Sequence, residues 1–275
     1  MLARYINLRE AVERRSSLEA NIRALPAGKW QVARFEAIDT SRDETRHLPG
    51  SASPAEKACY LSHRALLTEM LHAGAMDPFF VWEDDVLVGQ LTHEAAVSYT
   101  KSVGIETWDL LFTDIVVPDL NNMLLLLTYA RRLRSLQKIE ALDLRSIVFA
   151  GTTSYLVNPT ALPKLIKLLS GIHSLDKPLD LQLRQWIHQG LIKAHVLFPF
   201  VTTVADAGLK SQISPEDTNG TDLAWNLYRR LVWWERNTQE LHPLCNRLAS
   251  IHPDAESSIM GIISAALISP HFVPK

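Results

Sequence analysis

Three consecutive carboxylates follow a short apolar segment and are the residues best placed to do chemistry in this chain. Phe79-Phe80-Val81-Trp82 has the composition of a buried strand, and Glu83-Asp84-Asp85 comes directly after it. Open α/β sheets bind ligands at the carboxyl ends of their strands. Adjacent acids repel one another and resist desolvation, so a divalent cation that neutralises them is the simplest explanation for the cluster. Oxygen ligands suit Mg²⁺ or Mn²⁺.

Side-chain alternation along a strand predicts separate roles for the three acids. Glu83 and Asp85 are expected to point the same way and to hold the metal, whereas Asp84 is expected to point to the opposite side. In a nucleotide sugar, such a metal would bridge the diphosphate and neutralise the charge that develops as the diphosphate leaves the anomeric carbon. The alternative for an isolated triplet is a solvated strand end, or acids that cap the next turn.

The elements that must position these acids follow an alternating pattern. Short apolar runs, expected as strands, cover residues 4–8, 32–38, 79–82, 110–113, 147–157 and 194–201. Stretches of helical spacing cover residues 10–24, 54–71, 123–137, 161–169 and 179–189, and Ser53 to Glu56 forms a capping box at the start of the second. This alternation is typical of βα units and predicts an α/β fold with a mostly parallel sheet.

A change in composition divides the chain. Residues 214–220 are polar and loop-like, and the following segment places Leu223, Leu227, Leu231 and Trp234 on one helical stripe. We therefore expect an α/β domain over residues 1–213 and a helical C-terminal extension over residues 214–275.

Composition excludes several function classes. The 28 Lys and Arg residues balance 30 Asp and Glu residues, so there is no basic field of the kind that holds nucleic acid. Two cysteines provide no disulfide framework, and charged residues near the N-terminus interrupt any export signal. We expect a cytoplasmic protein whose membrane association, if any, is peripheral at the inner membrane.

Several segments stand together in a recognisable order: Tyr5 to Arg9 with Glu13-Arg14-Arg15, then residues 34–39, 56–64 and 82–86, and later 151–157 and 178–180. This set resembles glycosyltransferase family 25, the lipooligosaccharide-biosynthesis glycosyltransferases, which include the collagen hydroxylysine galactosyltransferases. The resemblance covers roughly residues 4–213. It implies a GT-A fold, a UDP-sugar donor carrying galactose or glucose, a divalent cation with Mn²⁺ favoured over Mg²⁺, and transfer with inversion at the anomeric carbon.

The resemblance also implies roles for particular residues. The expected donor-binding residues are Tyr5, Asn7, Arg9, Ser62, His63 and Asp84. At the end of the first strand, Tyr5 is expected to stack on uracil and Arg9 to approach phosphate. The alternatives are a core position for Tyr5, a solvated position for Arg9, and a packing role for His63.

Inverting transfer requires a base that takes the proton of the acceptor hydroxyl and does not bind the metal. Asp180 is the first candidate because it matches a family landmark and can lie opposite the acidic segment. Asp114, after another expected strand, is the competitor. An aspartate at a helix start, such as Asp180, also serves as a cap or as a partner of the helix dipole.

The acceptor remains open because the segment from Asp114 to Arg145 matches no family landmark. A glycan or glycolipid of the lipopolysaccharide type is the main expectation, and a protein hydroxyl is the alternative. A non-catalytic protein that binds nucleotide sugars is a third possibility. The C-terminal helix, with Trp225, Arg229 and Arg230, suits either an anionic membrane surface or packing on the catalytic domain.

Overall fold

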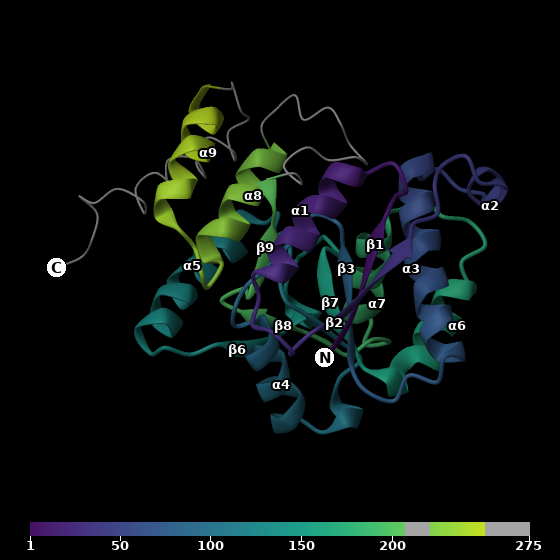
Figure 1. Ribbon diagram of the computed structural model, residues 1–275, viewed down its shortest axis with the longest axis horizontal. Helices are drawn as coiled ribbons and strands as arrows, with labels where there is room; N and C mark the ends of the chain where they lie inside the picture. Colours follow the sequence, from purple (N-terminus) through teal and green to yellow (C-terminus); the bar gives the residue numbers. More distant parts are fainter. Residues whose placement is uncertain (207–220, 251–275) are drawn as a thin grey trace.

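A seven-stranded sheet forms the centre of the molecule and brings β1 and β3 side by side (Figure 1). The computed structural model describes residues 1–206 and 221–250. The strand order is β2-β1-β3-β7-β5-β8-β6, with bounds in that order of Gln31–Glu36, Leu2–Asn7, Phe79–Glu83, Ser154–Val157, Leu110–Phe112, Ala194–Phe198 and Glu140–Asp143. Only β7 and β6 run against the other strands of this sheet. The predicted α/β class with a mostly parallel sheet is confirmed, and it is compatible with a GT-A-like fold.

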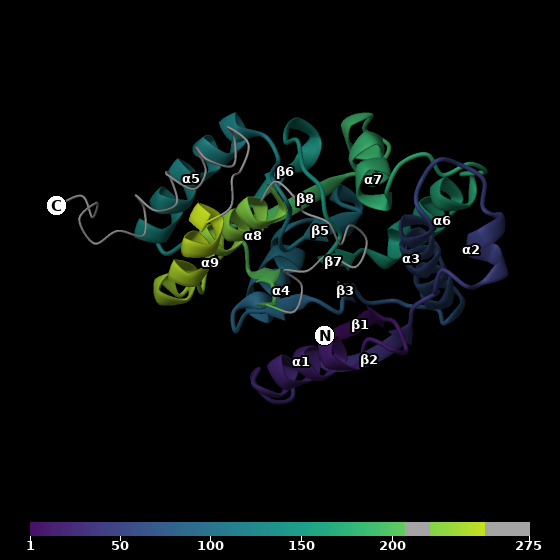
Figure 2. The ribbon, with the colours of Figure 1, turned by 90° about the horizontal axis from the view of Figure 1, so that it is seen from above.

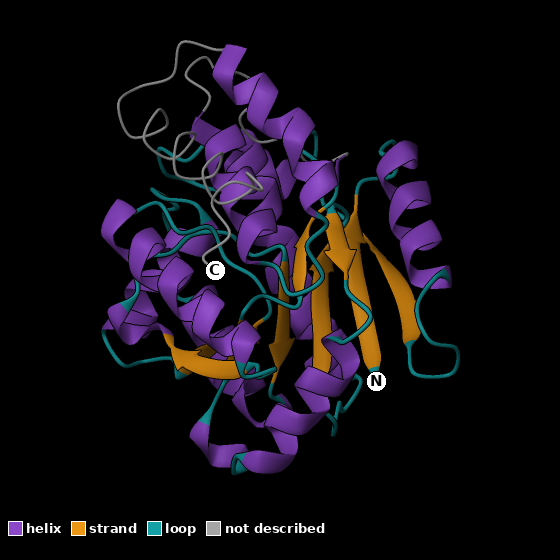
Figure 3. Cartoon of the chain, turned by 90° about the vertical axis from the view of Figure 1, so that its left-hand side faces the viewer, coloured by secondary structure: helices purple, strands orange, loops and turns teal. Residues whose placement is uncertain are grey.

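Helices pack on both faces of this sheet (Figure 3). α1 (Val12–Arg23) and α4 (Thr92–Ser102) cover one face. The other face carries α3 (Pro54–His72), α5 (Leu120–Ser135), α6 (Leu162–Ser170) and α7 (Leu179–His188). Side chains alternate along β3, so that Phe80 and Trp82 pack in the layer of α1 and α4, whereas Phe79 and Val81 pack in the layer of α3 and α5–α7. A strand buried on both faces explains the continuous apolar run before the acids.

Helix α3 begins at the predicted capping box. The Ser53 hydroxyl accepts a hydrogen bond from the Glu56 amide (3.3 Å), and the Glu56 carboxylate accepts one from the Ser53 amide (2.6 Å). Pro54 occupies the first helical position, where its missing N–H is not needed. The capped start fixes which residues of α3 face the sheet, and these include Ser62 and His63.

Several shorter elements were not predicted. β4 (Val86–Val88) follows the acidic segment and pairs with β9 (Thr202–Val204) in a separate two-stranded sheet. β6 and α4 were also missed, as were α2 (Asp43–His47) and the short 3₁₀ turns Ile105–Thr107, Leu144–Ser146 and Pro159–Ala161. The strand expected over residues 147–157 is wrong in length. It is confined to β7, because Gly151 has a φ of 88° that interrupts extended backbone.

The C-terminal helices α8 (Thr221–Val232) and α9 (Thr238–Ser250) join the main hydrophobic core. Leu223, Leu227 and Leu231 of the predicted stripe are all buried there. α8 also contacts α5, and Figure 2 shows the two helices side by side. The polar segment 214–220 and the domain boundary near residue 213 lie outside the described residues.

Candidate active site

A pocket of about 360 Å³ opens beside the carboxyl ends of β1 and β3. The parallel pairing of these strands sets Ile6 opposite Glu83, so the residues that follow each strand meet at one edge. Asn7 and Arg14 line the pocket from the first βα unit, and α3 contributes Cys59 and His63. The pocket therefore lies at the site expected for a ligand of an open α/β sheet.

All three acids of the predicted segment line this pocket. Glu83 contacts His63 of α3 and Thr152, whereas Asp84 contacts Asn7 and Arg14 of the first βα unit. β3 ends at Glu83, and Asp84 and Asp85 form the turn into β4. Asp85 therefore lies in a turn, where the alternation of a strand no longer sets the direction of its side chain.

Asp84 is held by two partners from the N-terminal βα unit. Its carboxylate accepts hydrogen bonds from Asn7 Nδ2 (2.8 Å) and Arg14 NH1 (3.1 Å). Asn7 is oriented in turn by Arg34, whose Nε donates to Asn7 Oδ1 (3.0 Å). Burial raises the pKa of Asp84, and the hydrogen bonds from Asn7 and Arg14 only partly oppose this. Asp84 therefore ties β1 and α1 to the β3–β4 turn.

Glu83 has a different set of partners. Its Oε1 accepts a hydrogen bond from the Thr152 hydroxyl (2.6 Å) and lies 3.4 Å from His63 Nε2. Burial raises the pKa of this carboxyl, but His63 and Thr152 more than offset that effect, so the pKa is lowered overall. Glu83 is thus ionised at neutral pH.

Asp85 is the least satisfied of the three acids. Its Oδ2 lies 3.5 Å from Arg14 NH1, and its buried Oδ1 has no hydrogen-bond partner among the described residues. Burial, followed by the charge of Glu83, raises the pKa of Asp85 to about 7. An unpartnered carboxylate oxygen beside the ionised Glu83 fits the requirements of a divalent cation with oxygen ligands.

The segment from Gly151 to Tyr155 holds several side chains of the site from behind the residues that line the pocket. The Gly151 amide donates a hydrogen bond to Asp180 (2.7 Å), and the Thr152 hydroxyl donates one to Glu83 (2.6 Å). The Thr153 hydroxyl accepts one from Arg229 (2.9 Å), and the Tyr155 hydroxyl is hydrogen-bonded to His63 (2.8 Å). The segment enters the antiparallel strand β7 and so begins at the edge where β3 ends. One short stretch of chain thereby positions four side chains.

Helix α8 forms another wall of the pocket. Asp222, Asn226 and Arg229 line it, and their spacing places them on one helical face. Arg229 is 4% exposed and forms an ion pair with Asp114, which is 1% exposed. The C-terminal segment is therefore part of the site as well as of the core.

A comparison with protein families decides the identity of this site. The model of glycosyltransferase family 25 (LPS biosynthesis protein) matches residues 2–182. The chain belongs to this family. It is accordingly a glycosyltransferase, which uses a sugar donor and a glycan acceptor. A search of curated proteins finds no match to the chain.

Four of the expected donor-binding residues of this glycosyltransferase, Asn7, Ser62, His63 and Asp84, line the pocket. The hydroxyl of Ser62 is already engaged, since it donates to Ala58 O (2.7 Å) and accepts from the Ile38 amide (2.9 Å). Asn7 is similarly bound to its neighbours. These residues shape the pocket and hold the β1, β3 and α3 segments together.

Tyr5 and Arg9, the other two expected donor-binding residues, are not among the pocket-lining residues. Tyr5 lies in the core on the α1 side of the sheet, where its hydroxyl donates to Glu19 (2.8 Å). The Arg9 side chain is 78% exposed and pairs with Glu36. Arg14, and not Arg9, lies beside Asp84 and Asp85.

Neither of the predicted catalytic bases lines the pocket. Asp114 is held by Arg229, which leaves it poorly placed to accept a proton from a substrate. The Asp180 carboxylate accepts hydrogen bonds from the Gly151 amide and the Leu181 amide, so both of its oxygens have partners. Burial, followed by the charges of Glu83, Asp180 and Asp85, raises the pKa of the Cys59 thiol. Helix α7, which carries Asp180, contacts α3.

The glycosyltransferase site also contains residues that the sequence analysis missed. Arg14 belongs to a matched family segment and could have been found there, whereas Asn226 lies outside residues 2–182. The C-terminal arginines face inward: Arg229 pairs with Asp114, and Arg230 donates to Val204 O (2.8 Å). Both arginines therefore contribute to the packing of α8 on the rest of the chain. Among the described residues, no helix has the length and apolarity needed to cross a bilayer.

Proposed function

We propose that this glycosyltransferase transfers galactose or glucose, with inversion and with the help of a divalent cation, from a UDP-sugar to a hydroxyl of a lipopolysaccharide-type glycan. The observation that carries the metal dependence is the buried Asp85 Oδ1, which has no hydrogen-bond partner among the described residues, beside the Glu83 carboxylate, whose pKa is lowered mainly by His63. A volume of about 360 Å³ is within the range of small-molecule sites. An acceptor of this type is a glycolipid, so the proposal includes peripheral contact with the cytoplasmic face of the inner membrane.

Glu83 and Asp85 are the residues that would hold the cation, with Mn²⁺ favoured over Mg²⁺. When bound, the cation supplies charge neutralisation for the departing diphosphate. Arg14 and Arg229 add fixed positive charge to the pocket wall, where the guanidinium groups suit phosphate oxygens. Arg14 also keeps Asp84 in place, which holds the acidic turn in one conformation.

The base for the acceptor hydroxyl is expected to be a carboxylate that lines the pocket outside the acidic turn. The carboxylates that meet this condition are Glu10, Asp39 and Asp222, whereas Asp180 and Asp114 do not line the pocket. Glu10 is exposed and Asp39 already accepts hydrogen bonds from Ser41, so we assign the base role to Asp222. Its position on the element that lies outside the family match suits a residue that faces a variable acceptor.

Calorimetric binding of UDP-galactose and UDP-glucose, with and without Mn²⁺, tests the proposal. We expect Mn²⁺-dependent binding of one of them to the full chain and its loss in Asp85→Asn. Arg14→Gln is expected to weaken donor binding by about 1.5–3 kcal/mol, or roughly 10- to 100-fold, because a charged hydrogen-bond donor is removed. Arg9→Gln is the matched control and should bind like the wild type, since Arg9 does not line the pocket.

Other outcomes separate the competing functions. An absence of nucleotide-sugar binding under every metal condition would contradict the proposed donor. Binding without hydrolysis or transfer would favour a non-catalytic nucleotide-sugar-binding protein. Transfer to a peptide hydroxyl in preference to a lipopolysaccharide-type glycan would favour the protein acceptor.

A further inference from the structure

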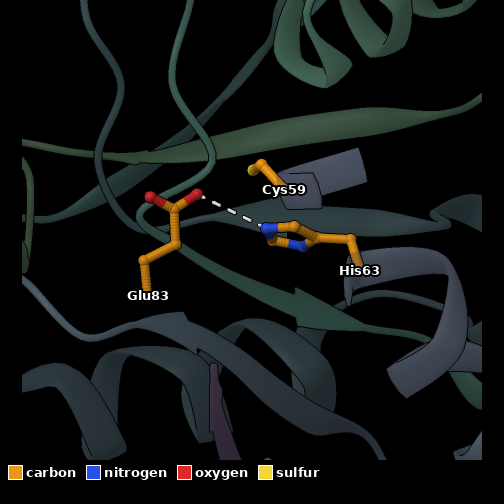
Figure 4. Close-up of side chains that lie close together, drawn as sticks. All are labelled: Cys59, His63 and Glu83. Carbon is orange, nitrogen blue, oxygen red and sulfur yellow. Dashed lines mark ion pairs between the residues drawn. The ribbon is translucent and has the colours of Figure 1, made fainter. Parts of the chain in front are cut away.

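Three side chains of different chemistry converge at one end of the pocket. Cys59 and His63 lie one turn apart on α3, and Glu83 ends β3. The Cys59 sulfur, a His63 ring nitrogen and a Glu83 carboxylate oxygen all lie within 4.8 Å of one another. Figure 4 shows the His63 ring and the Glu83 carboxylate facing each other, with Cys59 beside them. Among the described residues, these three side chains are close enough together to act as ligands of one metal ion.

His63 supplies a second, independent observation. It is 1% exposed, and its Nε2 has no hydrogen-bond partner among the described residues, although Glu83 Oε1 lies 3.4 Å away. Its Nδ1 is hydrogen-bonded to the Tyr155 hydroxyl (2.8 Å), and the two rings are stacked with centroids 5.8 Å apart. The ring is therefore fixed so that an unsatisfied nitrogen points at the Glu83 carboxylate, which is the arrangement of a metal-binding histidine.

The ligand types and spacing indicate which cation would fit. In a tetrahedral zinc site with bonds of about 2.0–2.3 Å, neighbouring ligand atoms lie roughly 3.4 Å apart. The separation of His63 Nε2 and Glu83 Oε1 already has this value. Sulfur and imidazole ligands favour Zn²⁺, whereas sites built from oxygen ligands suit Mn²⁺ and Mg²⁺.

We propose that Cys59, His63 and Glu83 bind one Zn²⁺ ion, with the fourth position open to the pocket that all three residues line. The Cys59 thiol loses its proton to solvent as the sulfur–zinc bond forms. Thr152 and Tyr155 act as outer partners, because each holds a ligand by a hydrogen bond. Both come from the Gly151 to Tyr155 segment, which also holds Arg229 through Thr153.

This site differs from the one proposed for the donor metal. Glu83 is common to both, but Asp85 belongs only to the donor-metal site, and Cys59 and His63 belong only to the zinc site. The zinc proposal does not depend on the identity of the nucleotide sugar. Variants at Asp85 and Cys59 therefore report on the two sites separately.

The test uses the full chain after removal of metal with a chelator. Zn²⁺ is added, excess metal is removed by gel filtration, and the metal per chain is measured by elemental mass spectrometry. Co²⁺ is then substituted, and the sulfur-to-cobalt charge-transfer absorbance is recorded. We expect one zinc per chain and a clear charge-transfer band. Asp85→Asn should keep both while it loses Mn²⁺-dependent donor binding.

The two cysteines of the chain provide a matched pair of variants. Cys245 lies on α9, away from the cluster, so Cys245→Ser should keep the cobalt band, whereas Cys59→Ser should lose it. Tyr155→Phe removes only a hydroxyl from a buried ring and should weaken zinc affinity by roughly 10- to 100-fold. A wild-type chain that retains no zinc, or a cobalt band that survives in Cys59→Ser, would overturn the proposal. If Cys59→Ser does not fold, an unchanged zinc affinity in Tyr155→Phe would overturn it instead.

Discussion

At the scale of single residues, the three adjacent acids are stabilised unequally. Asp84 has two hydrogen-bond donors, and Glu83 has Thr152 and a neighbouring imidazole. Within the part of the chain that the structure describes, the Asp85 carboxylate has the more distant Arg14 as its ion-pair partner and keeps one buried oxygen without a hydrogen bond. A buried carboxylate oxygen without a partner destabilises the folded protein unless a bound ligand satisfies it.

This inequality leads to a prediction for the metal-free protein. Burial raises the pKa of Asp85 from 3.8 to about 7, so the folded state binds a proton at Asp85 that the unfolded state has released. Between these values the stability of the wild type falls as pH rises, and above about pH 7 the loss is complete. Metal-free Asp85→Asn avoids this loss. Its free energy of unfolding should exceed that of the wild type at pH 8, and the difference should shrink towards pH 4.

Urea unfolding at pH 8, 6 and 4 in the presence of a chelator measures the difference. Excess Mn²⁺ should reduce or reverse it at pH 8, because only the wild type keeps both proposed ligands. A difference that is the same at all three pH values would show that the Asp85 charge is not its cause.

Single residues also show where sequence reasoning reaches its limit. The acidic segment could be predicted because its members are contiguous and follow an apolar run. Its turn geometry could not, since the end of β3 depends on pairing with β7. Arg9 and Arg14 have the same residue type and lie close together in the chain, yet only Arg14 faces the acids. Which arginine does so depends on how α1 packs across the sheet.

At the scale of elements, α8 performs two tasks on two of its faces. Leu227 and Leu231 enter the hydrophobic core and are almost completely buried. Asn226 and Arg229 line the pocket. A helix anchored in this way positions polar groups more accurately than a loop would.

The two faces of α8 should respond to mutation in opposite ways. Leu227→Ala removes a fully buried side chain and should lower the free energy of unfolding by about 2–5 kcal/mol, with little change in the KM of the folded enzyme. Asn226→Ala should change stability by less than about 1 kcal/mol and should raise the KM for substrate. Chemical denaturation and steady-state kinetics measure both quantities. Equal effects of the two variants on KM would contradict the division of roles.

Elements with local signals were predicted well, and those without were missed. The capping box at Ser53 predicted the start of α3 because every interaction it needs lies within four residues. β6 has no such signal, since Glu140 and Ala141 are exposed and break any apolar alternation. The pocket face of α8 depends on partners far along the chain: Arg229 and Asp114 are 115 residues apart. Only tertiary packing brings such groups together.

At the scale of the whole molecule, the pocket joins the two ends of the described chain. Asn7 and Arg14 come from the first βα unit, and Asn226 and Arg229 come from α8. The acidic turn and the Gly151 to Tyr155 segment lie between them in the sequence. This segment is hydrogen-bonded to Glu83 through Thr152 and to Arg229 through Thr153. A ligand in this pocket therefore contacts elements that are distant in sequence, and binding should stabilise both ends at once.

Hydrogen exchange followed by mass spectrometry should reveal this coupling. With donor and Mn²⁺ each at about 100 times its dissociation constant, each linked binding step adds about 2.7 kcal/mol and slows globally exchanging amides roughly 100-fold. Amides that exchange by local opening identify the elements that contact ligand. We expect slower exchange in α1, in the β3–β4 turn and in α8, and little local change in α4, which does not line the pocket. Slower exchange confined to residues 2–182 would mean that the ligand does not reach α8, and that the family segment binds the donor by itself.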